Sequence, residues 1–307
     1  TNTICFFINM KNKINILIIG FGSIGRRHAK ILSNQNFVAN VYIHSKILNH
    51  KFKPIKKLNK DNLKAIDYVI IANKTSEHYK TLKKINNIVN NIPILVEKPL
   101  FDKRREKINL RNKVFVGYNM RFNPLIEFLK AKVGNKDVKK ISISSHSNLK
   151  NWRTNLDYSK SESAKNINGV LNDYSHEIDF LYWSFGNLKK TFSLNKKLSN
   201  LKIKGNDFFV FVGKIKKIMV IIEFNFFSKQ NERSIKIDLN DKSYKFDLIN
   251  KSITKFTNKK YSKVKISKFS RNSVYLDMHL NILFSKKKRA CTYQEGLKIN
   301  DFLNRVK

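Results

Sequence analysis

The stretch "KINILIIGFGSIGRRHAK", residues 13–30, decides how the N-terminal part of this chain folds. Residues 13–20 are a short apolar run, rich in β-branched side chains and closed by glycine, which is typical of a buried parallel strand. The residues that follow place Ile24, His28 and Ile31 at helical spacing. A strand that turns directly into a helix predicts the first half of a βαβ unit.

The turn between that strand and that helix has the pattern G-x-G-x-x-G. Gly20 allows the tight turn, Gly22 lets the backbone approach a pyrophosphate, and Gly25 permits close packing of helix and strand. The backbone N–H groups at the start of the helix, at Ser23 and Ile24, can receive the anion. In this context the pattern favours a dinucleotide cradle over a glycine-rich turn without a ligand.

The end of the second predicted strand, residues 37–45, bears on which dinucleotide binds. A site that prefers NAD usually carries Asp or Glu there, to hold the ribose hydroxyls. This chain has Ser45 and Lys46 instead, and a hydroxyl with a cation suits a 2′-phosphate. The sequence therefore favours NADP over NAD, although Lys46 can also be one more surface lysine.

The rest of the chain changes its pattern near residue 120. Before that point strands alternate with helices, which predicts a doubly wound parallel sheet. After it, long alternating segments with turn-rich breaks predict an antiparallel sheet. We expect an α/β protein of two domains, residues 11–120 and 121–307. The expected elements are strands at 67–73, 93–100, 113–119 and 138–146, helices at 75–89, 124–133, 272–284 and 293–306, and the antiparallel sheet between 190 and 260.

The charge of this chain is extreme, with 62 basic against 22 acidic side chains and a formal net charge of +40. Proteins that bind nucleic acid gather such charge on one face or in one arm. Here lysines are spread along the whole chain, and only 11 of the 62 basic residues are arginine. The chain also holds 39 asparagines, so a compositional drift explains the charge better than a polyanion partner.

Two cysteines, Cys5 and Cys291, cannot build a disulfide framework or a metal site of usual spacing, which points to a reducing cytoplasm. No apolar run is long enough to predict a membrane span. The segment before Met10 is too short in apolar residues for a signal peptide, and we expect the natural start at Met10.

The segment "VEKPL", residues 96–100, places Glu97 and Lys98 at the carboxyl edge of the parallel sheet, where such sheets bind ligands. A lysine beside a cationic oxidised nicotinamide has its ammonium form disfavoured, which lowers its pKa. Lys98 can then share a proton with a substrate hydroxyl. Pro99 fixes the backbone behind it, with a cis peptide as one option. The alternative that Lys98 has no catalytic role is strong, because lysine is abundant in this chain.

The segment "GVLNDYSHEIDFLYWSFG", residues 169–186, predicts a greasy helix that carries Asp173 and His176 three positions apart, on neighbouring places of its surface. Charged groups in a half-buried helix cost free energy unless they are paired or used. The alternative is a hydrogen-bonded core histidine. We expect Glu177 to be solvated or paired with a lysine, and Asp179 to be structural.

Taken in order, five segments resemble the glucose–fructose oxidoreductase, inositol dehydrogenase and MocA family (Gfo/Idh/MocA) of dehydrogenases. They are "ILIIGFGSIGRRHAK", "DYVIIANKTSEHY", "LVEKPL", "VGYNMRFNP" and "GVLNDYSHEIDFLYWSFG". The resemblance covers most of residues 13–186 and is weaker beyond. It implies a Rossmann domain followed by a domain with a large open sheet, which covers the substrate and commonly mediates oligomerisation.

The resemblance also implies roles for individual residues. Lys98 and His176 are the expected catalytic pair, and Asp173 would orient the imidazole and favour its charged form. A carbinol substrate would give a hydride to the nicotinamide and a proton to His176 or Lys98. Further cofactor contacts are Asn73, His78, Glu97 and Lys98; substrate contacts are Arg121, Trp152, Arg153 and Tyr158, with Asp157 beside them.

Three positions depart from the family's usual pattern: Asn172 stands where Asp is frequent, Lys74 where Pro is common, and Asn123 where His is frequent. The shifted carboxylate leaves the role of Asp173 more open than that of His176. None of the three changes removes a chemically essential group.

We therefore expect a cytoplasmic NAD(P)-dependent oxidoreductase that acts on a sugar, a sugar derivative or a nucleotide-linked sugar, in surface-polysaccharide metabolism. We expect a homo-oligomer without a metal, a membrane or a specific nucleic-acid partner. One alternative is a dinucleotide sensor that kept the fold and lost the chemistry. The other, motivated only by charge, is a polyanion-binding protein.

Overall fold

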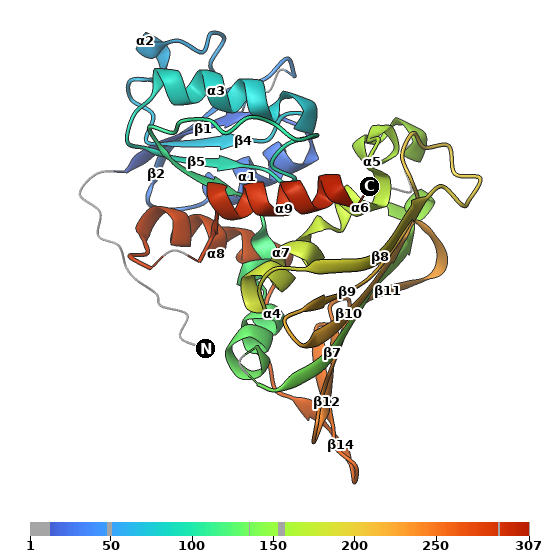
Figure 1. The fold of residues 1–307 in the computed structure, drawn as a ribbon. Helices are drawn as coiled ribbons and strands as arrows, with labels where there is room; N and C mark the ends of the chain where they lie inside the picture. Colours follow the sequence, from blue (N-terminus) through green and yellow to red (C-terminus); the bar gives the residue numbers. More distant parts are fainter. Residues whose placement is uncertain (1–12, 48–50, 135, 153–156, 288, 307) are drawn as a thin grey trace. The chain divides into compact units, whose positions relative to one another are not determined.

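The structure is a computed structural model, which describes residues 13–47, 51–134, 136–152, 157–287 and 289–306. The chain forms two compact units (Figure 1). The first runs to Phe122 and takes in Phe269–Asn300; the second consists of Asn123–Lys268 and the residues from Asp301 onward. The domain limits predicted from sequence, 11–120 and 121–307, stay a prediction, but the compact units differ from them in returning residues 269–300 to the N-terminal part.

The first unit is built on a seven-stranded sheet in the order β15-β6-β5-β4-β1-β2-β3. Strands β1 to β6 run parallel, and β15 pairs antiparallel with β6 at one edge. The strand order reverses between β1 and β4, and that reversal is where open α/β sheets bind ligands. The predicted Rossmann-type sheet is confirmed. Its strands are β1 (Ile14–Ile19), β2 (Val38–His44), β3 (Lys53–Pro54), β4 (Tyr68–Ile71), β5 (Pro93–Val96), β6 (Lys113–Val116) and β15 (Cys291–Thr292).

Strands β4, β5 and β6 end earlier than the sequence predicted, at Ile71, Val96 and Val116. Backbone hydrogen bonds to the neighbouring strands reach one residue further, to Ala72, Glu97 and Gly117, and the chain then leaves the sheet. Glu97 and Lys98 consequently lie in the loop that follows β5, at the carboxyl edge.

The helices of the first unit include one that is distant in sequence. Its hydrophobic core joins Ile16 and Ile18 of β1 and Leu32 of α1 to Met278 and Ile282 of α8. A capping box between Ser270 and Ser273 fixes the start of α8. The helices are α1 (Ser23–Leu32), α2 (Lys60–Leu63), α3 (His78–Ile88), α8 (Arg271–Phe284) and the first part of α9 (Tyr293–Arg305), with short 3₁₀ turns at Thr75–Glu77 and Asn119–Phe122.

The second unit is built on an eight-stranded sheet in the order β14-β13-β12-β11-β7-β10-β9-β8. Strands β7 and β10 pair in parallel and the other neighbours antiparallel, which confirms the expected large, mainly antiparallel sheet. Its strands are β7 (Val138–Asn148), β8 (Lys189–Lys196), β9 (Phe208–Ile215), β10 (Ile218–Asn225), β11 (Phe227–Leu239), β12 (Ser243–Asp247), β13 (Ser252–Phe256) and β14 (Tyr261–Val264).

The two faces of this sheet differ, because alternate side chains point to opposite sides. On one face Phe211, Val220 and Ile222 are fully buried, and the helices of the unit lie on that side (Figure 1). On the other face Phe192 and Ile221 are 52% and 39% exposed. The helices are α4 (Pro124–Phe128), which continues as a π turn (Leu129–Val133), α5 (Glu162–Lys165), α6 (Gly169–Asp173) and α7 (Ser175–Ser184), with 3₁₀ turns at Leu149–Trp152 and Tyr158–Lys160.

The helix expected over residues 169–186 is in fact two helices. The first, α6, ends at Asp173, and α7 begins at Ser175. Tyr174 between them leaves the helical backbone, with φ −94° and ψ 20°, and its ring packs against Trp152 and Phe224. Asp173 and His176 therefore stand on different helices, which corrects the expectation of one shared helical surface.

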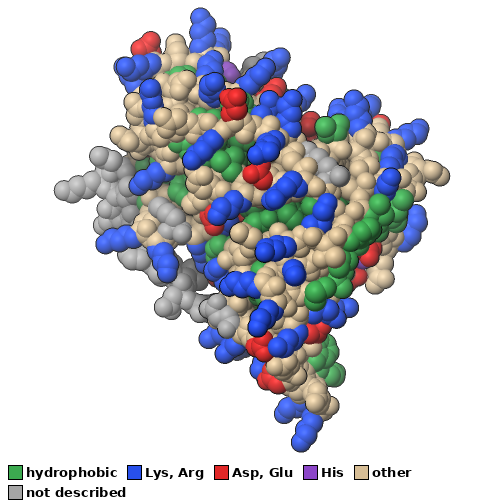
Figure 2. All heavy atoms as spheres, viewed as in Figure 1, with side chains coloured by type: hydrophobic (Ala, Val, Ile, Leu, Met, Phe, Trp, Pro, Cys, Tyr) green, Lys and Arg blue, Asp and Glu red, His purple; other side chains and the backbone are tan. Residues whose placement is uncertain are grey.

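The surface carries its positive charge in a scattered way. On the face shown in Figure 2, Lys and Arg side chains are interspersed with other residues over both units. None of the helices in the described ranges combines the length and the apolar composition that crossing a bilayer needs.

Candidate cofactor and catalytic site

The glycine-rich turn after β1 has two positions where no other residue fits. Gly20 has φ +96°, and a Cβ there would lie 2.5 Å from the backbone nitrogen of Asn73. A Cβ on Gly25 would lie 2.1 Å from the carbonyl oxygen of Gly20. Gly22 is different, because none of the described residues other than its two chain neighbours has an atom within 4 Å of the place its Cβ would take. The turn thus leaves open space at its middle glycine.

The start of α1 is suited to an anion. Gly22 is its N-cap in an extended conformation, and no side chain of the described residues caps the helix. The N–H groups of Ser23 and Ile24 therefore open the helix toward the space at Gly22, without an acidic residue in the first turn. Free donors and a positive helix end fit the pyrophosphate of a dinucleotide.

The end of β2 carries no carboxylate. The hydroxyl of Ser45 accepts a hydrogen bond from the backbone N–H of Ile47 at 3.0 Å, and Lys46 is exposed. Residues 48–50 lie outside the described part of the chain. This end of the strand thus offers a hydroxyl and a cation, and their role in holding a cofactor stays a prediction.

The loop after β4 brings Asn73 beside the glycine turn. Its side-chain amide donates to Glu77 at 3.1 Å and to Thr81 at 2.9 Å. Its side-chain oxygen is buried and has no hydrogen-bond partner among the described residues. Buried polar atoms are normally satisfied, so this oxygen fits a site that receives a polar ligand.

His78 ties two loops of this edge together. Its ring is buried, with Nδ1 3.1 Å from the carbonyl oxygen of Pro99 and 3.2 Å from that of Leu100, and Nε2 3.2 Å from that of Asn73. Burial lowers the pKa of the ring, against the opposing effect of these carbonyls. Because both nitrogens face backbone carbonyls, this environment favours a supporting role over the predicted cofactor contact.

Glu97 and Lys98 leave β5 on a fixed backbone. Oε1 of Glu97 lies 2.9 Å from Nε2 of His28, and Oε2 accepts from the backbone N–H of Lys98 at 3.3 Å. A Cβ on Gly117 would lie 2.7 Å from Oε1, so glycine makes room for this carboxylate. Lys98 is half-buried, and its bond to Pro99 is cis, the option raised by the sequence. The Lys98 amine thus starts from a rigid edge of the sheet.

Arg121 has a different setting from the one predicted. Its guanidinium is 1% exposed and lies 3.0 Å from the carboxylate of Glu295 and 3.4 Å from the carbonyl oxygen of Arg289. This burial inside the first unit favours a structural role over the predicted substrate contact.

In the second unit Asp173 and His176 are both half-buried. Their neighbour Glu177 is fully buried, which makes the expectation of a solvated or lysine-paired side chain wrong. Its Oε1 lies 2.6 Å from Nε of Arg233 and accepts from Ser145 at 3.1 Å. The partner comes from the sheet beneath, where a fully buried carboxylate needs a fixed cation.

Tyr174, Ser147 and Arg233 form a support that the sequence did not reveal. The hydroxyls of Tyr174 and Ser147 lie 2.7 Å apart, and Nε1 of Trp152 donates to Ser147 at 2.8 Å. The Arg233 guanidinium stands 5.8 Å from the centre of the Tyr174 ring. Burial raises the pKa of Tyr174 to about 12, so it keeps its proton. Ser147 lies on β7 and Arg233 on the neighbouring β11, whereas Tyr174 lies between α6 and α7, so the three meet only in the folded unit.

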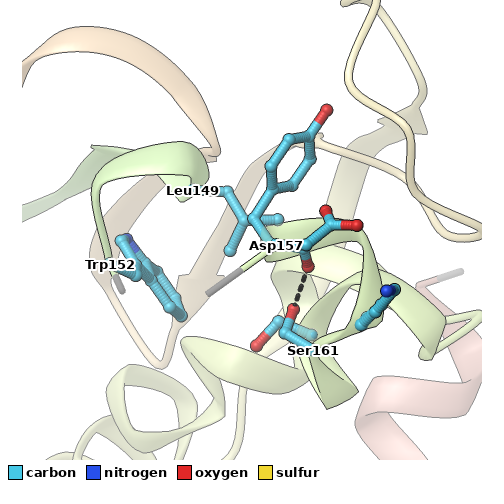
Figure 3. A pocket seen from close by; sticks show the side chains of 7 residues that line it. Leu149, Trp152, Asp157 and Ser161 are labelled. Atoms are coloured by element: carbon cyan, nitrogen blue, oxygen red, sulfur yellow. Dashed lines mark hydrogen bonds between the residues drawn. The ribbon is translucent and has the colours of Figure 1, made fainter. Parts of the chain in front are cut away.

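A pocket of about 270 Å³ opens beside this support (Figure 3). Trp152 lies on one side of it, and Asp157 and Ser161 on the other; the Ser161 hydroxyl donates to the Tyr158 carbonyl at 2.6 Å. Two predicted substrate contacts, Trp152 and Tyr158, share this pocket, whereas Arg153 lies outside the described residues. The lining residues are Leu149, Trp152, Asp157, Tyr158, Lys160, Ser161 and Ser163.

Comparison with protein families gives one match. Residues 14–110 match GFO_IDH_MocA, an oxidoreductase family with an NAD-binding Rossmann fold. No curated protein sequence matches the chain. The match spans the glycine turn, the end of β4 and the Glu97–Lys98 edge.

Solved structures of the same fold match nearly the whole chain. The UDP-N-acetylglucosamine 3-dehydrogenase of Acidithiobacillus ferrooxidans has a TM-score of 0.78 and 15% identity, with 96% of each chain covered. An oxidoreductase of Agrobacterium radiobacter, solved with NAD+, L-tartaric acid and magnesium, has a TM-score of 0.79 and 15% identity over 95% of this chain and 94% of its own. The WlbA dehydrogenase of Bordetella pertussis, solved with NADH and UDP-GlcNAcA, has a TM-score of 0.73 and 16% identity over 96% and 95%.

Proposed function

We propose that this chain, an NAD-binding oxidoreductase of the Gfo/Idh/MocA family by its N-terminal domain, transfers a hydride between a nicotinamide cofactor and a carbinol or carbonyl carbon of a sugar. The observation that carries the proposal is the open space at Gly22, faced by the uncapped start of α1, in a domain that matches this family. The sugar class is motivated by two relatives of the same fold whose names include nucleotide sugars.

The bound cofactor would accept or supply the hydride, and the protein's part is to hold the substrate and move a proton. We assign this proton transfer to Lys98 and His176, with Asp173 orienting the imidazole. Lys98 suits the role because its backbone is fixed by Glu97, and because a cationic nicotinamide nearby would lower the pKa of its amine. Oxidation of a hydroxyl needs a base of this kind.

NADP is the cofactor that we favour over NAD. A 2′-phosphate would gain a hydrogen bond from Ser45 and an ion pair with Lys46 at the end of β2. A carboxylate, which would repel that phosphate, is absent from positions 44–47 at this end of the strand.

The pocket at Trp152 and Tyr158 is our candidate for part of the substrate site. Trp152 is 41% exposed, so the face of its ring is available to the apolar face of a sugar. The hydroxyl of Ser161 and the carboxylate of Asp157, beside it in Figure 3, offer partners for sugar hydroxyls. An aromatic surface with a few polar groups is the usual composition of such pockets.

We further propose a homo-oligomer that forms through the open face of the large sheet. Phe192, Val212 and Ile221 are paired across β8, β9 and β10 and point to that face. Figure 2 shows hydrophobic side chains gathered where this sheet lies. We place the protein in the cytoplasm, in keeping with a sequence that holds two cysteines, too few for a disulfide framework.

The experiment that tests the proposed function is a panel of UDP-linked and free sugars, each with NADP and with NAD, followed by the absorbance of the reduced nicotinamide. We expect turnover with at least one nucleotide-linked sugar and a higher kcat/KM with NADP. Tight cofactor binding without turnover of any sugar would favour the sensor alternative. Binding of nucleic acid that survives physiological salt would favour the polyanion alternative.

A further inference from the structure

Behind Glu97 a chain of three hydrogen bonds runs through the first unit. Oε1 of Glu97 lies 2.9 Å from Nε2 of His28, and Nδ1 of His28 lies 2.9 Å from Nε2 of His279. Nδ1 of His279 lies 3.0 Å from the hydroxyl of Tyr68. The four residues come from the end of β5, from α1, from α8 and from β4, and both histidines and Tyr68 are fully buried.

The direction of this chain follows from its far end. If the Tyr68 oxygen accepted from His279, the buried phenol hydrogen would have no acceptor among the described residues, at a cost of about 1–3 kcal/mol. Tyr68 therefore donates to Nδ1 of His279. The proton of His279 then sits on Nε2 and is donated to Nδ1 of His28, and the proton of His28 sits on Nε2 and is donated to Glu97.

The protonation states agree with this direction. Burial, and secondly the charge of His28 when protonated, hold the pKa of His279 well below its usual range, so the ring is neutral. Burial, and secondly the charge of Glu97, raise the pKa of Tyr68 well above its usual range, so the phenol keeps the proton that it donates.

This series of hydrogen bonds is closed to solvent at both ends, since Tyr68 is 0% and Glu97 is 6% exposed. A closed chain is no route for protons to bulk water, but it holds its last member in one orientation. That member is the Glu97 carboxylate, whose second oxygen accepts from the backbone N–H of Lys98 at 3.3 Å. Both oxygens are thus engaged, one by His28 and one by the residue that carries the amine.

We propose that His279 is a positioning residue for the reaction: through His28 it sets the orientation of the Glu97 carboxylate and so the point from which Lys98 reaches the substrate. The inference rests on the proposed function, because it gives Lys98 the proton transfer. His279 lies in the part of the chain beyond the family match at 14–110, and nothing in its local sequence marks it.

The first test compares two substitutions at one position. His279→Met fills similar space and removes the donor to His28, whereas the side-chain amide of His279→Gln can still donate. We expect kcat to fall by about 10- to 100-fold in His279→Met, because small misplacements of a reacting group cost this much. Cofactor Kd should change by less than about 2-fold, and His279→Gln should recover most of the lost kcat. A wild-type kcat in a folded His279→Met variant, or equal losses in both variants, would overturn the proposal.

The second test needs no variant to be active. The ring nitrogens of a ¹⁵N-histidine-labelled wild-type protein report the tautomer of each ring by NMR, with His28→Gln and His279→Gln used for assignment. We expect neutral rings with the proton on Nε2 at both His28 and His279. A proton on Nδ1 of either ring, or a charged ring, would refute the proposed direction. If the wild type turns over no sugar, the proposed function fails. The tautomers of His28 and His279 still decide whether the series of hydrogen bonds from Tyr68 to Glu97 runs in the proposed direction.

Discussion

A methyl group added at Gly25 would collide with the backbone, whereas one added at Gly22 would enter open space. Substitutions at these two glycines can therefore distinguish an effect on folding from an effect on cofactor binding. At Gly25 the Cβ would stand 2.1 Å from a backbone oxygen, and we expect Gly25→Ala to lower the free energy of unfolding by about 1–3 kcal/mol or more. At Gly22 the described residues, its two chain neighbours aside, leave the space within 4 Å empty, so Gly22→Ala should change stability by less than about 1 kcal/mol.

The same Gly22→Ala variant should weaken NADP binding by about 10-fold or more, because its methyl group occupies the space for the pyrophosphate. Urea unfolding and a fluorescence titration with the cofactor check the two halves of this prediction. A folded Gly22→Ala protein that binds the cofactor as tightly as the wild type would show that the turn holds no dinucleotide.

For individual residues, the sequence predicted environments that depend on near neighbours in the chain and missed those that depend on distant residues. The need for glycine at Gly20 and Gly25 follows from a short pattern within one turn. The environment of Glu177 does not, because its partner Arg233 lies 56 positions further along the chain. Burial turned an expected surface carboxylate into one half of an ion pair.

The ion pair between Glu177 of α7 and Arg233 of β11 holds this helix against the sheet. Arg233→Met would leave the fully buried carboxylate of Glu177 without its cation, and we expect a loss on the order of 3 kcal/mol in the free energy of unfolding. The double variant Glu177→Gln with Arg233→Met removes both charges and should recover part of this loss. Equal stability of Arg233→Met and the wild type in urea would contradict the role given to the pair.

The packing of α8 against α1 makes stability depend on pH. Burial holds the pKa of His279 well below its unfolded value near 6.5, so below that pH the unfolded chain binds a proton that the folded one does not. The contribution of the neutral His279 to the free energy of unfolding is therefore complete above pH 6.5. It is lost as the pH falls below that value, by at most about 1.4 kcal/mol per pH unit. His78, with a pKa lowered in the same direction, adds to the slope.

His279→Gln should reduce this slope, as measured by urea unfolding at pH values on either side of 6.5. An identical slope in the variant and the wild type would mean that His279 takes up its proton in the folded state.

The break between α6 and α7 could not be predicted from the sequence, because the helical pattern over 169–186 is unbroken. Packing of Tyr174 against the sheet overrides this local periodicity.

For the whole molecule, the open face of the large sheet predicts self-association. Ile221→Lys places a charge in the row formed with Phe192 and Val212, and we expect it to dissociate the oligomer, as followed by light scattering. Ile249→Lys is the matched control, because Ile249 is 49% exposed in a hairpin turn away from that row. A wild-type monomer at micromolar concentration, or equal dissociation by both variants, would count against this face.

The fold class was predictable at this scale because alternation of strands and helices is written along the chain. The return of residues 269–300 to the first unit was not, since the contact between His28 and His279 joins residues 251 positions apart. No local pattern encodes a contact of that range, and the buried chain behind Glu97 depends on it.

The proton transfer assigned to Lys98 is tested most directly by the turnover of Lys98→Ala, measured together with its cofactor affinity. We predict that kcat falls by about 100- to 10,000-fold, the share that a positioned acid or base supplies, while cofactor Kd changes only a few-fold. Lys84→Ala, an exposed lysine on α3, is the matched control and should behave as the wild type. A Lys98→Ala protein that turns over its sugar as fast as the control would show that Lys98 does not transfer the proton.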